Sequence, residues 1–214
     1  MRTLQTTISL TLLLMATWAN AGLVTLTNST GGVVDNSNIV QGVNVTAGHL
    51  AGFTDSIIDI NLTVDFSKCS SSQNINGCVG EGGSTFSREI VFNLGHIATT
   101  VSLVAQDTFS GQDTSARVTQ TYDDEAASTV GGALLLNGDF QPIGSLSDFD
   151  GMSALGLWEF TFEDTVGSDG LVVHSWSLNI ELNESTSNNV PEPISLLLFG
   201  LGLTILGFFS RKKV

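Results

Sequence analysis

Clustered carboxylates are the residues of this sequence whose type and spacing could support chemistry. Calcium is bound by about six to eight oxygen atoms, and carboxylates on neighbouring loops can supply them. None of the clusters is an EF-hand loop, because Gly151 follows Asp148 too closely. In the alternative interpretation, Asp124 and Asp164 cap turns by accepting hydrogen bonds from nearby backbone amides. The candidate calcium ligands are Asp123, Asp124, Asp148, Asp150, Asp164 and Asp169.

The motifs of common hydrolases and nucleotide-binding enzymes do not occur in the sequence. The three histidines, at positions 49, 96 and 174, lack the spacing of a zinc protease, and there is no Gly-x-Ser-x-Gly turn and no phosphate-binding glycine motif. Paired carboxylates can hydrolyse glycosides. Acidic residues are so abundant here, however, that such pairs arise by chance. We therefore predict no enzymatic activity, with a minor hydrolase as the least favoured alternative.

The N-terminal residues 1–21 have the three parts of a secretory signal peptide. Arg2 gives a positive charge, residues 8–16 are apolar, and Ala19-Asn20-Ala21 forms a small-x-small cleavage site. The sequence therefore predicts export, with a signal peptidase as the first processing partner.

The C-terminal residues combine a short motif, an apolar stretch and a basic cluster. After a polar linker at 185–189, Val190, Pro191, Glu192 and Pro193 precede an apolar run at 194–209. A helix over this run would span about 24 Å, slightly less than a hydrocarbon layer of about 30 Å. The basic residues after it should stay in the cytoplasm, which places the preceding chain outside. The flanking basic residues are Arg211, Lys212 and Lys213.

In their order and spacing, residues 190–214 resemble the PEP-CTERM sorting signal. The resemblance implies a Gram-negative bacterium with an exosortase that recognises Pro191-Glu192-Pro193 and cleaves nearby during transfer to the cell surface. A plain single-pass membrane anchor is the alternative.

Between these two ends the chain is strongly acidic. Lys68, Arg88 and Arg117 are its basic residues, whereas all of the 21 acidic residues except Glu192 lie there. Such a surface repels phosphate backbones, so nucleic acid is excluded as a partner. The acids either attract divalent cations or simply keep an exported protein soluble.

The two cysteines, Cys69 and Cys78, are predicted to form a disulfide. Exported proteins fold in an oxidising compartment, and the residues between the two cysteines are rich in Ser, Asn and Gly, as expected of a surface loop. No further soft ligands for a metal site stand nearby.

Residues 22–184 are predicted to form one all-β domain, an antiparallel, two-sheet, jelly-roll-like sandwich. Apolar residues alternate over short runs that Gly-rich turns separate, and no helical period interrupts them. Trp158 and Trp176 fall on the apolar faces of their strands and are predicted core residues. A turn is expected at Gly138-Asp139. The predicted strands are 23–27, 40–46, 58–66, 88–94, 99–105, 117–122, 133–136, 157–163 and 171–182.

Residues 55–183 resemble the P domain that follows the catalytic domain of subtilisin-like proprotein convertases. The resemblance lies in three segments: Tyr122-Asp123-Asp124-Glu125-Ala126, Gly156-Leu157-Trp158-Glu159-Phe160 and Ser175-Trp176-Ser177-Leu178. The chain departs from the family at residues 94–99, where the family often has Ser-Pro-x-Gly-Thr. The resemblance implies a β-sandwich that is not itself the protease.

Taken together, the sequence predicts a non-catalytic surface protein associated with extracellular polysaccharide or biofilm matrix. The alternative is a calcium-dependent carbohydrate-binding or adhesive module.

Overall fold

The computed structural model describes residues 21–70, 72–74, 76–79, 85–113 and 116–184. The predicted signal peptide up to residue 20, the linker, the sorting signal and the apolar run at 194–209 lie outside these residues. In the described part, no helix is long and apolar enough to cross a membrane.

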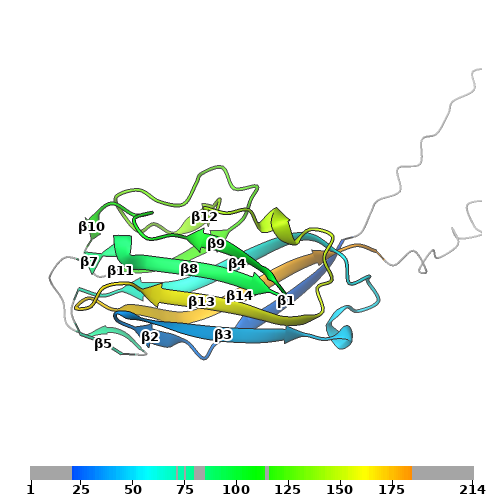
Figure 1. Cartoon of the computed structure of the whole chain (residues 1–214), viewed down its shortest axis with the longest axis horizontal. Coiled ribbons are helices and arrows are strands. Elements are labelled where there is room, and N and C mark those ends of the chain that lie inside the picture. The colour runs from blue at the N-terminus through cyan, green and yellow to red at the C-terminus, as the bar shows by residue number, and fades with distance from the viewer. Residues whose placement is uncertain (1–20, 71, 75, 80–84, 114–115, 185–214) are drawn as a thin grey trace, which may run out of the picture.

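Two β-sheets pack face to face and make up most of the domain (Figure 1). The first sheet has the order β1-β14-β4-β11-β12, and β2 also pairs with β14. Its strands are β1 (Gly22–Asn28), β2 (Gly32–Val34), β4 (Ile57–Lys68), β11 (Ala116–Tyr122), β12 (Gly138–Phe140) and β14 (Leu171–Leu182). The second sheet has the order β3-β13-β8-β9. Its strands are β3 (Ser37–Val45), β8 (Ile90–His96), β9 (Thr99–Val104) and β13 (Gly156–Asp164).

Two small ribbons and three short 3₁₀ helices complete the described fold. The ribbons pair β5 (Ser72–Asn74) with β6 (Gly77–Val79) and β7 (Thr85–Phe86) with β10 (Gln112–Asp113). The 3₁₀ helices are η1 (Ala47–His49), η2 (Ser87–Glu89) and η3 (Leu146–Phe149). The predicted fold class of antiparallel sheets with few helices is confirmed, although β11 and β12 pair in parallel. The finer assignment as a jelly roll stays a prediction.

Alternation along β4 places its apolar side chains in the core, as the sequence predicts, except at its start. Ile60, Leu62, Val64 and Phe66 are fully buried, whereas Ile58 is 40% exposed. The register shifts opposite β14 between Glu181 and Leu182, so Ile57 takes the inward position instead. A β-bulge inserts an extra residue and reverses the alternation beyond it.

The two predicted core tryptophans are buried between the sheets. Trp158 lies edge-on to Phe149, and its indole N–H donates to the carbonyl of Ala154 at 2.9 Å. Trp176 packs on Phe160 of the opposite sheet and donates to Gln41 Oε1 at 3.0 Å. A buried indole usually needs a partner for its N–H, and both have one. The prediction for both residues is confirmed.

The predicted strand at residues 133–136 is wrong, as is the predicted turn at Gly138-Asp139. Residues 133–136 form no strand, and Leu134 and Leu136 are 51% and 56% exposed. The strand is β12, which begins at Gly138 and pairs with β11. A run of leucines has high apolar content but finds no sheet neighbour here, and tertiary contacts override the local pattern.

Candidate functional site: a buried ionic cluster around Lys68

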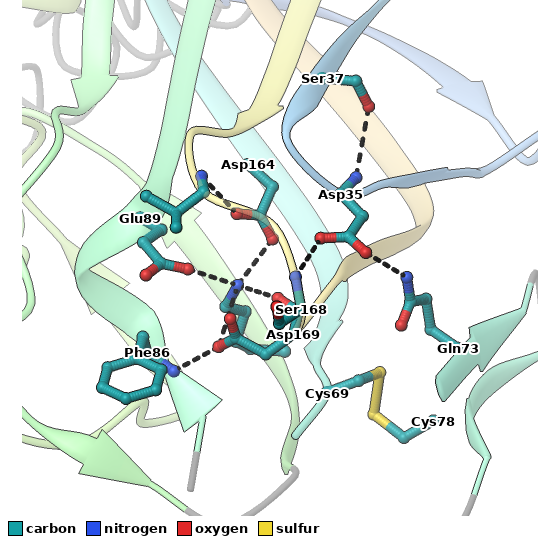
Figure 2. Close-up of polar contacts among 12 residues, drawn as sticks. Asp35, Ser37, Cys69, Gln73, Cys78, Phe86, Glu89, Asp164, Ser168 and Asp169 are labelled. Atoms are coloured by element: carbon teal, nitrogen blue, oxygen red, sulfur yellow. Dashed lines mark hydrogen bonds and ion pairs between the residues drawn. A yellow bond between two sulfur atoms is a disulfide. The ribbon is translucent and has the colours of Figure 1, made fainter. Parts of the chain in front are cut away.

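The disulfide between Cys69 and Cys78 is present and fastens the loop after β4 (Figure 2). Cys69 directly follows the last residue of β4, and Cys78 lies in β6. The backbone N–H of Cys69 donates to the carbonyl of Gly170 at 2.9 Å. This end of β4 is therefore held both covalently and by hydrogen bonds.

Lys68 lies next to this disulfide, and its ammonium group is surrounded by carboxylates. Its side chain is 0% exposed, and Nζ lies 2.6 Å from Asp164 Oδ2. Nζ also lies 3.4 Å from Glu89 Oε2 and 3.4 Å from Asp169 Oδ2. It donates in addition to the backbone carbonyl of Asp169. One cation thus meets three acids in the interior, and Figure 2 shows these contacts converging.

The cluster joins the two sheets at one end of the sandwich. Lys68 is the last residue of β4 in the first sheet, and Asp164 is the last residue of β13 in the second. Glu89 ends η2 immediately before β8, and Asp169 lies between β13 and β14. Alternation places Lys68 on the same inward face as Phe66, so the strand itself directs the lysine into the core.

Backbone hydrogen bonds fix the acids around the lysine. Asp169 Oδ2 accepts from the N–H of Phe86 at 2.6 Å, and Asp164 Oδ1 accepts from the N–H of Val166 at 3.3 Å. The carbonyl of Glu89 accepts from the N–H of Thr165 at 3.1 Å. The carboxylates of Asp164 and Asp169 are therefore preorganised, and the bond to Glu89 fixes the backbone from which its side chain extends.

Burial shifts two of these acids toward their neutral forms. Desolvation raises the pKa of Glu89 to about 7, although Lys68 acts in the opposite direction, and the neighbouring Asp169 raises it further. Desolvation likewise raises the pKa of Asp164 to about 6 against the lowering effect of Lys68. The charged form of a buried acid is penalised unless it is fully compensated, and a single lysine does not compensate three acids.

An open pocket of about 460 Å³ lies beside the cluster, and Glu89 and Asp169 are part of its lining. These two carboxylates are slightly exposed, with side chains 7% and 6% accessible, whereas Lys68 and Asp164 are fully enclosed. The cluster therefore has a closed side in the core and a side that reaches solvent.

The candidate calcium ligands fall into two separate places. Asp164 and Asp169 lie around the Lys68 ammonium, which already occupies the position of a cation between them. Asp124 lies against η3, the helix that contains Asp148, and Asp150 follows that helix directly. Among the described residues, no group of three or more His, Cys, Asp and Glu is arranged to hold a metal ion.

Asp124 caps the start of η3, which corresponds to the alternative interpretation of its role. Its carboxylate accepts hydrogen bonds from the N–H groups of Leu146 at 3.0 Å and Ser147 at 2.9 Å, and from Ser145 Oγ at 2.7 Å. Asp164 Oδ1 likewise accepts from the N–H of Val166, two residues on. Both acids therefore have structural partners of their own.

Replacing Asp124 with alanine is expected to destabilise the domain by about 1–2 kcal/mol at pH 7, because η3 loses its cap. Partial burial raises the pKa of Asp124, but the bonds from Ser145, Leu146 and Ser147 outweigh it, so the net shift is downward. Because the pKa of Asp124 is lower in the folded protein, its carboxylate stabilises the domain fully above the unfolded pKa of about 3.9. This stabilisation is lost as the pH falls through the lower, folded pKa.

Urea unfolding of the wild type and the Asp124→Ala variant at pH 7 and pH 3 measures this difference. The exposed Asp139 of β12 provides the matched control, because Asp139→Ala removes an acid without a helix cap. A difference of the same size at both pH values would contradict the capping role.

The three histidines lie apart and have hydrogen-bonding partners. His96 stacks on Trp158 with ring centroids 4.0 Å apart, and its ring nitrogens lie 2.9 Å and 2.8 Å from the carbonyls of Leu157 and Ser153. His174 Nε2 lies 2.8 Å from Ser67 Oγ, and His49 Nδ1 accepts from the N–H of Thr46. Each histidine therefore has a structural contact of its own.

Sequence reasoning found Asp164 and Asp169 but missed Lys68 and Glu89. One signal was present: Lys68 continues the inward alternation Leu62, Val64, Phe66, at a position where an apolar residue is expected. A lysine on the apolar face of a strand indicates a buried partner of opposite charge.

Comparisons with known proteins characterise the C-terminal end of the chain. No curated protein matches the sequence. A solved structure titled "Crystal Structure of FLHE" is similar over 78% of this chain and 100% of that chain, at 12% identity and a TM-score of 0.40. Residues 189–213 match the PEP-CTERM protein-sorting motif. The chain therefore carries a PEP-CTERM sorting motif, which indicates an exported, membrane-anchored surface protein of a Gram-negative bacterium that an exosortase sorts.

Proposed function

We propose that this chain is a non-catalytic surface protein whose β-sandwich associates with extracellular polysaccharide after exosortase sorting. The sorting motif at residues 189–213 is the observation that carries the proposal, because it assigns the protein to the cell surface. The P-domain assignment of residues 55–183 is part of the proposal, and it implies a β-sandwich that is not itself a protease.

The outer face of the first sheet supports contact with a polysaccharide. Four strands in register place Thr27, Ser177, Thr63 and Thr121 in one row across β1, β14, β4 and β11. Neighbouring members share hydrogen bonds, at 2.8 Å between Thr27 and Ser177 and 3.1 Å between Thr63 and Thr121. Hydroxyl groups both donate and accept, so this uncharged row can pair with sugar hydroxyls on a surface that is otherwise acidic.

Removal of two hydroxyls from this row tests the proposal. The full chain carrying Thr63→Val and Ser177→Ala is expected to co-sediment with the host's extracellular polysaccharide about tenfold more weakly, since two lost hydrogen bonds cost about 1–3 kcal/mol. Thr100→Val with Ser102→Ala in β9 is the matched control, because it removes two hydroxyls from the other sheet. Equal binding by all three proteins, or no binding by the wild type, would refute the association.

The calcium-dependent alternative has less support from the geometry. The described residues contain no preassembled group of metal ligands, and the Asp164–Asp169 pair already surrounds Lys68. This alternative stays a prediction, and a rise in melting temperature on addition of calcium would favour it over the first proposal.

A further inference from the structure

Lys68 and Asp164 bring an amine and a carboxyl group together where water is excluded. Both side chains are 0% exposed, and Nζ lies 2.6 Å from Oδ2. Oδ2 is bonded directly to Cγ, the carboxyl carbon with which Nζ would form an amide. We propose that Lys68 and Asp164 condense into an amide bond, from Nζ to Cγ, which joins the two sheets covalently.

Enclosure removes the two obstacles that prevent this condensation in water. An exposed lysine and an exposed aspartate are both ionised, and excess water favours the separate groups. In the interior, burial favours the protonated form of Asp164, and Nζ can supply the proton along the short contact. The fixed geometry also replaces a collision between two groups by an intramolecular reaction, which is worth about 7–11 kcal/mol of barrier in well-oriented cases.

Glu89 is positioned to carry the proton that the reaction moves. The neutral Lys68 amine attacks Cγ of the protonated Asp164, and the Nζ–Cγ bond forms. Glu89 Oε2, 3.4 Å from Nζ, takes a proton from the nitrogen and returns it to the departing hydroxyl. The Cγ–O bond breaks and one water molecule leaves, with no oxidation or reduction. The net reaction converts an ammonium and a carboxylate into an amide and water.

Three further observations support this assignment. The pKa of Glu89 is raised to about 7, mainly by burial, so the group can accept and donate a proton near neutral pH. The Asp169 carbonyl accepts a hydrogen bond from Nζ and helps hold it in place. The pocket that Glu89 and Asp169 line connects this side of the cluster to solvent, which gives the released water a path out.

The bond would complement the neighbouring disulfide. Cys69 and Cys78 fasten a loop, whereas an amide between Lys68 and Asp164 would link β4 of one sheet to β13 of the other. A reducing agent opens the first link and leaves the second intact. The inference is independent of the proposed function, because it concerns the maturation of the domain and not its ligand.

Peptide mapping of the full chain, isolated from its host after export, tests the proposal. The protein is denatured, reduced, alkylated and digested with trypsin, which cuts after free lysine and arginine. An acylated Lys68 is not cut, so the peptide of residues 69–88 is expected to be absent. Digestion with chymotrypsin should then release a branched peptide around Lys68 and Asp164, one water molecule lighter than its two parts together. Both peptides lie within the domain, so neither measurement depends on how the two ends of the chain are processed.

Three variants complete the experiment. Asp164→Ala and Glu89→Gln are expected to restore cleavage after Lys68 and the appearance of peptide 69–88. Asp107→Asn, at an exposed ion pair with Arg88, should keep Lys68 uncut. Complete cleavage after Lys68 in the wild-type protein isolated from its host would overturn the proposal. This result does not depend on whether any variant folds. Retention of the branched peptide in Glu89→Gln would overturn the role of Glu89.

Discussion

Alanine substitutions at Pro191, Glu192 and Pro193 are expected to abolish delivery of the protein to the cell surface and leave it in the inner membrane. These residues lie in the matched sorting motif and are the part that an exosortase is expected to recognise. The apolar run that follows them and the basic residues at 211–213 would remain, and these suffice to hold a chain in a membrane with its domain outside. The expected result is therefore mislocalisation of an intact, folded protein.

Cell fractionation and surface labelling measure this effect, and the same host without its exosortase should give the same distribution. Alanine substitutions at Ser185, Thr186 and Ser187 provide the matched control, since they alter the neighbouring segment and leave the motif intact. Unchanged localisation of the motif variant would show that residues 190–214 act as a plain membrane anchor. That result would leave the Lys68–Asp164 amide untouched, because its readout does not depend on sorting.

Replacement of Lys68 with methionine is expected to destabilise the domain by about 3–5 kcal/mol or more at pH 7, because it leaves buried carboxylates without their cation. Methionine keeps most of the volume of lysine, so loss of charge rather than a cavity dominates. Where the proposed amide has formed, Lys68 is no longer a cation, and the variant then loses the covalent link between the sheets instead of the ion pair. The surface variant Arg117→Met breaks a 2.6 Å ion pair with Asp65 in which the arginine is 59% exposed, and it should cost less than about 1 kcal/mol.

The stability of the Lys68→Met variant should also depend on pH in a defined direction. Glu89 and Asp164 have raised pKa values, about 7 and about 6, and removal of the lysine takes away the effect that lowers them. An acid whose pKa is raised by folding contributes stability below its unfolded value, and this is lost as the pH rises through the folded value. Melting temperatures should therefore be higher at pH 5 than at pH 8. Equal stability of Lys68→Met and Arg117→Met at pH 7 would contradict the ionic role.

The local alternation of apolar residues was sufficient to predict most of the strands. It was insufficient where pairing with a strand distant in sequence determines the structure. Alternation identified β4, β13 and β14, because a strand that is buried on one face repeats its side chains with a period of two. The same rule placed Ile58 inward, and the bulge opposite β14 reversed it. Leu134 and Leu136 looked like a strand but remain exposed, since no neighbouring strand covers them.

The candidate site was predictable only in part for a related reason. Cys69 and Cys78 are close in sequence, so an oxidising compartment and a short loop were enough to predict their disulfide. Lys68, Glu89 and the segment that carries Asp164 and Asp169 are far apart in sequence and meet only when both sheets close. Clusters of acids close in sequence suggested cation sites, and the structure instead gives Asp124 a capping role and Asp164 a lysine partner.

The sequence by itself determined where this protein goes and what kind of domain it carries, because a sorting motif and the period of a strand are local properties of the chain. The tertiary structure decided which charges face one another in the interior. The interaction between Lys68 and its carboxylates depends on their separation and on exclusion of water, and both arise only from the packing of the two sheets.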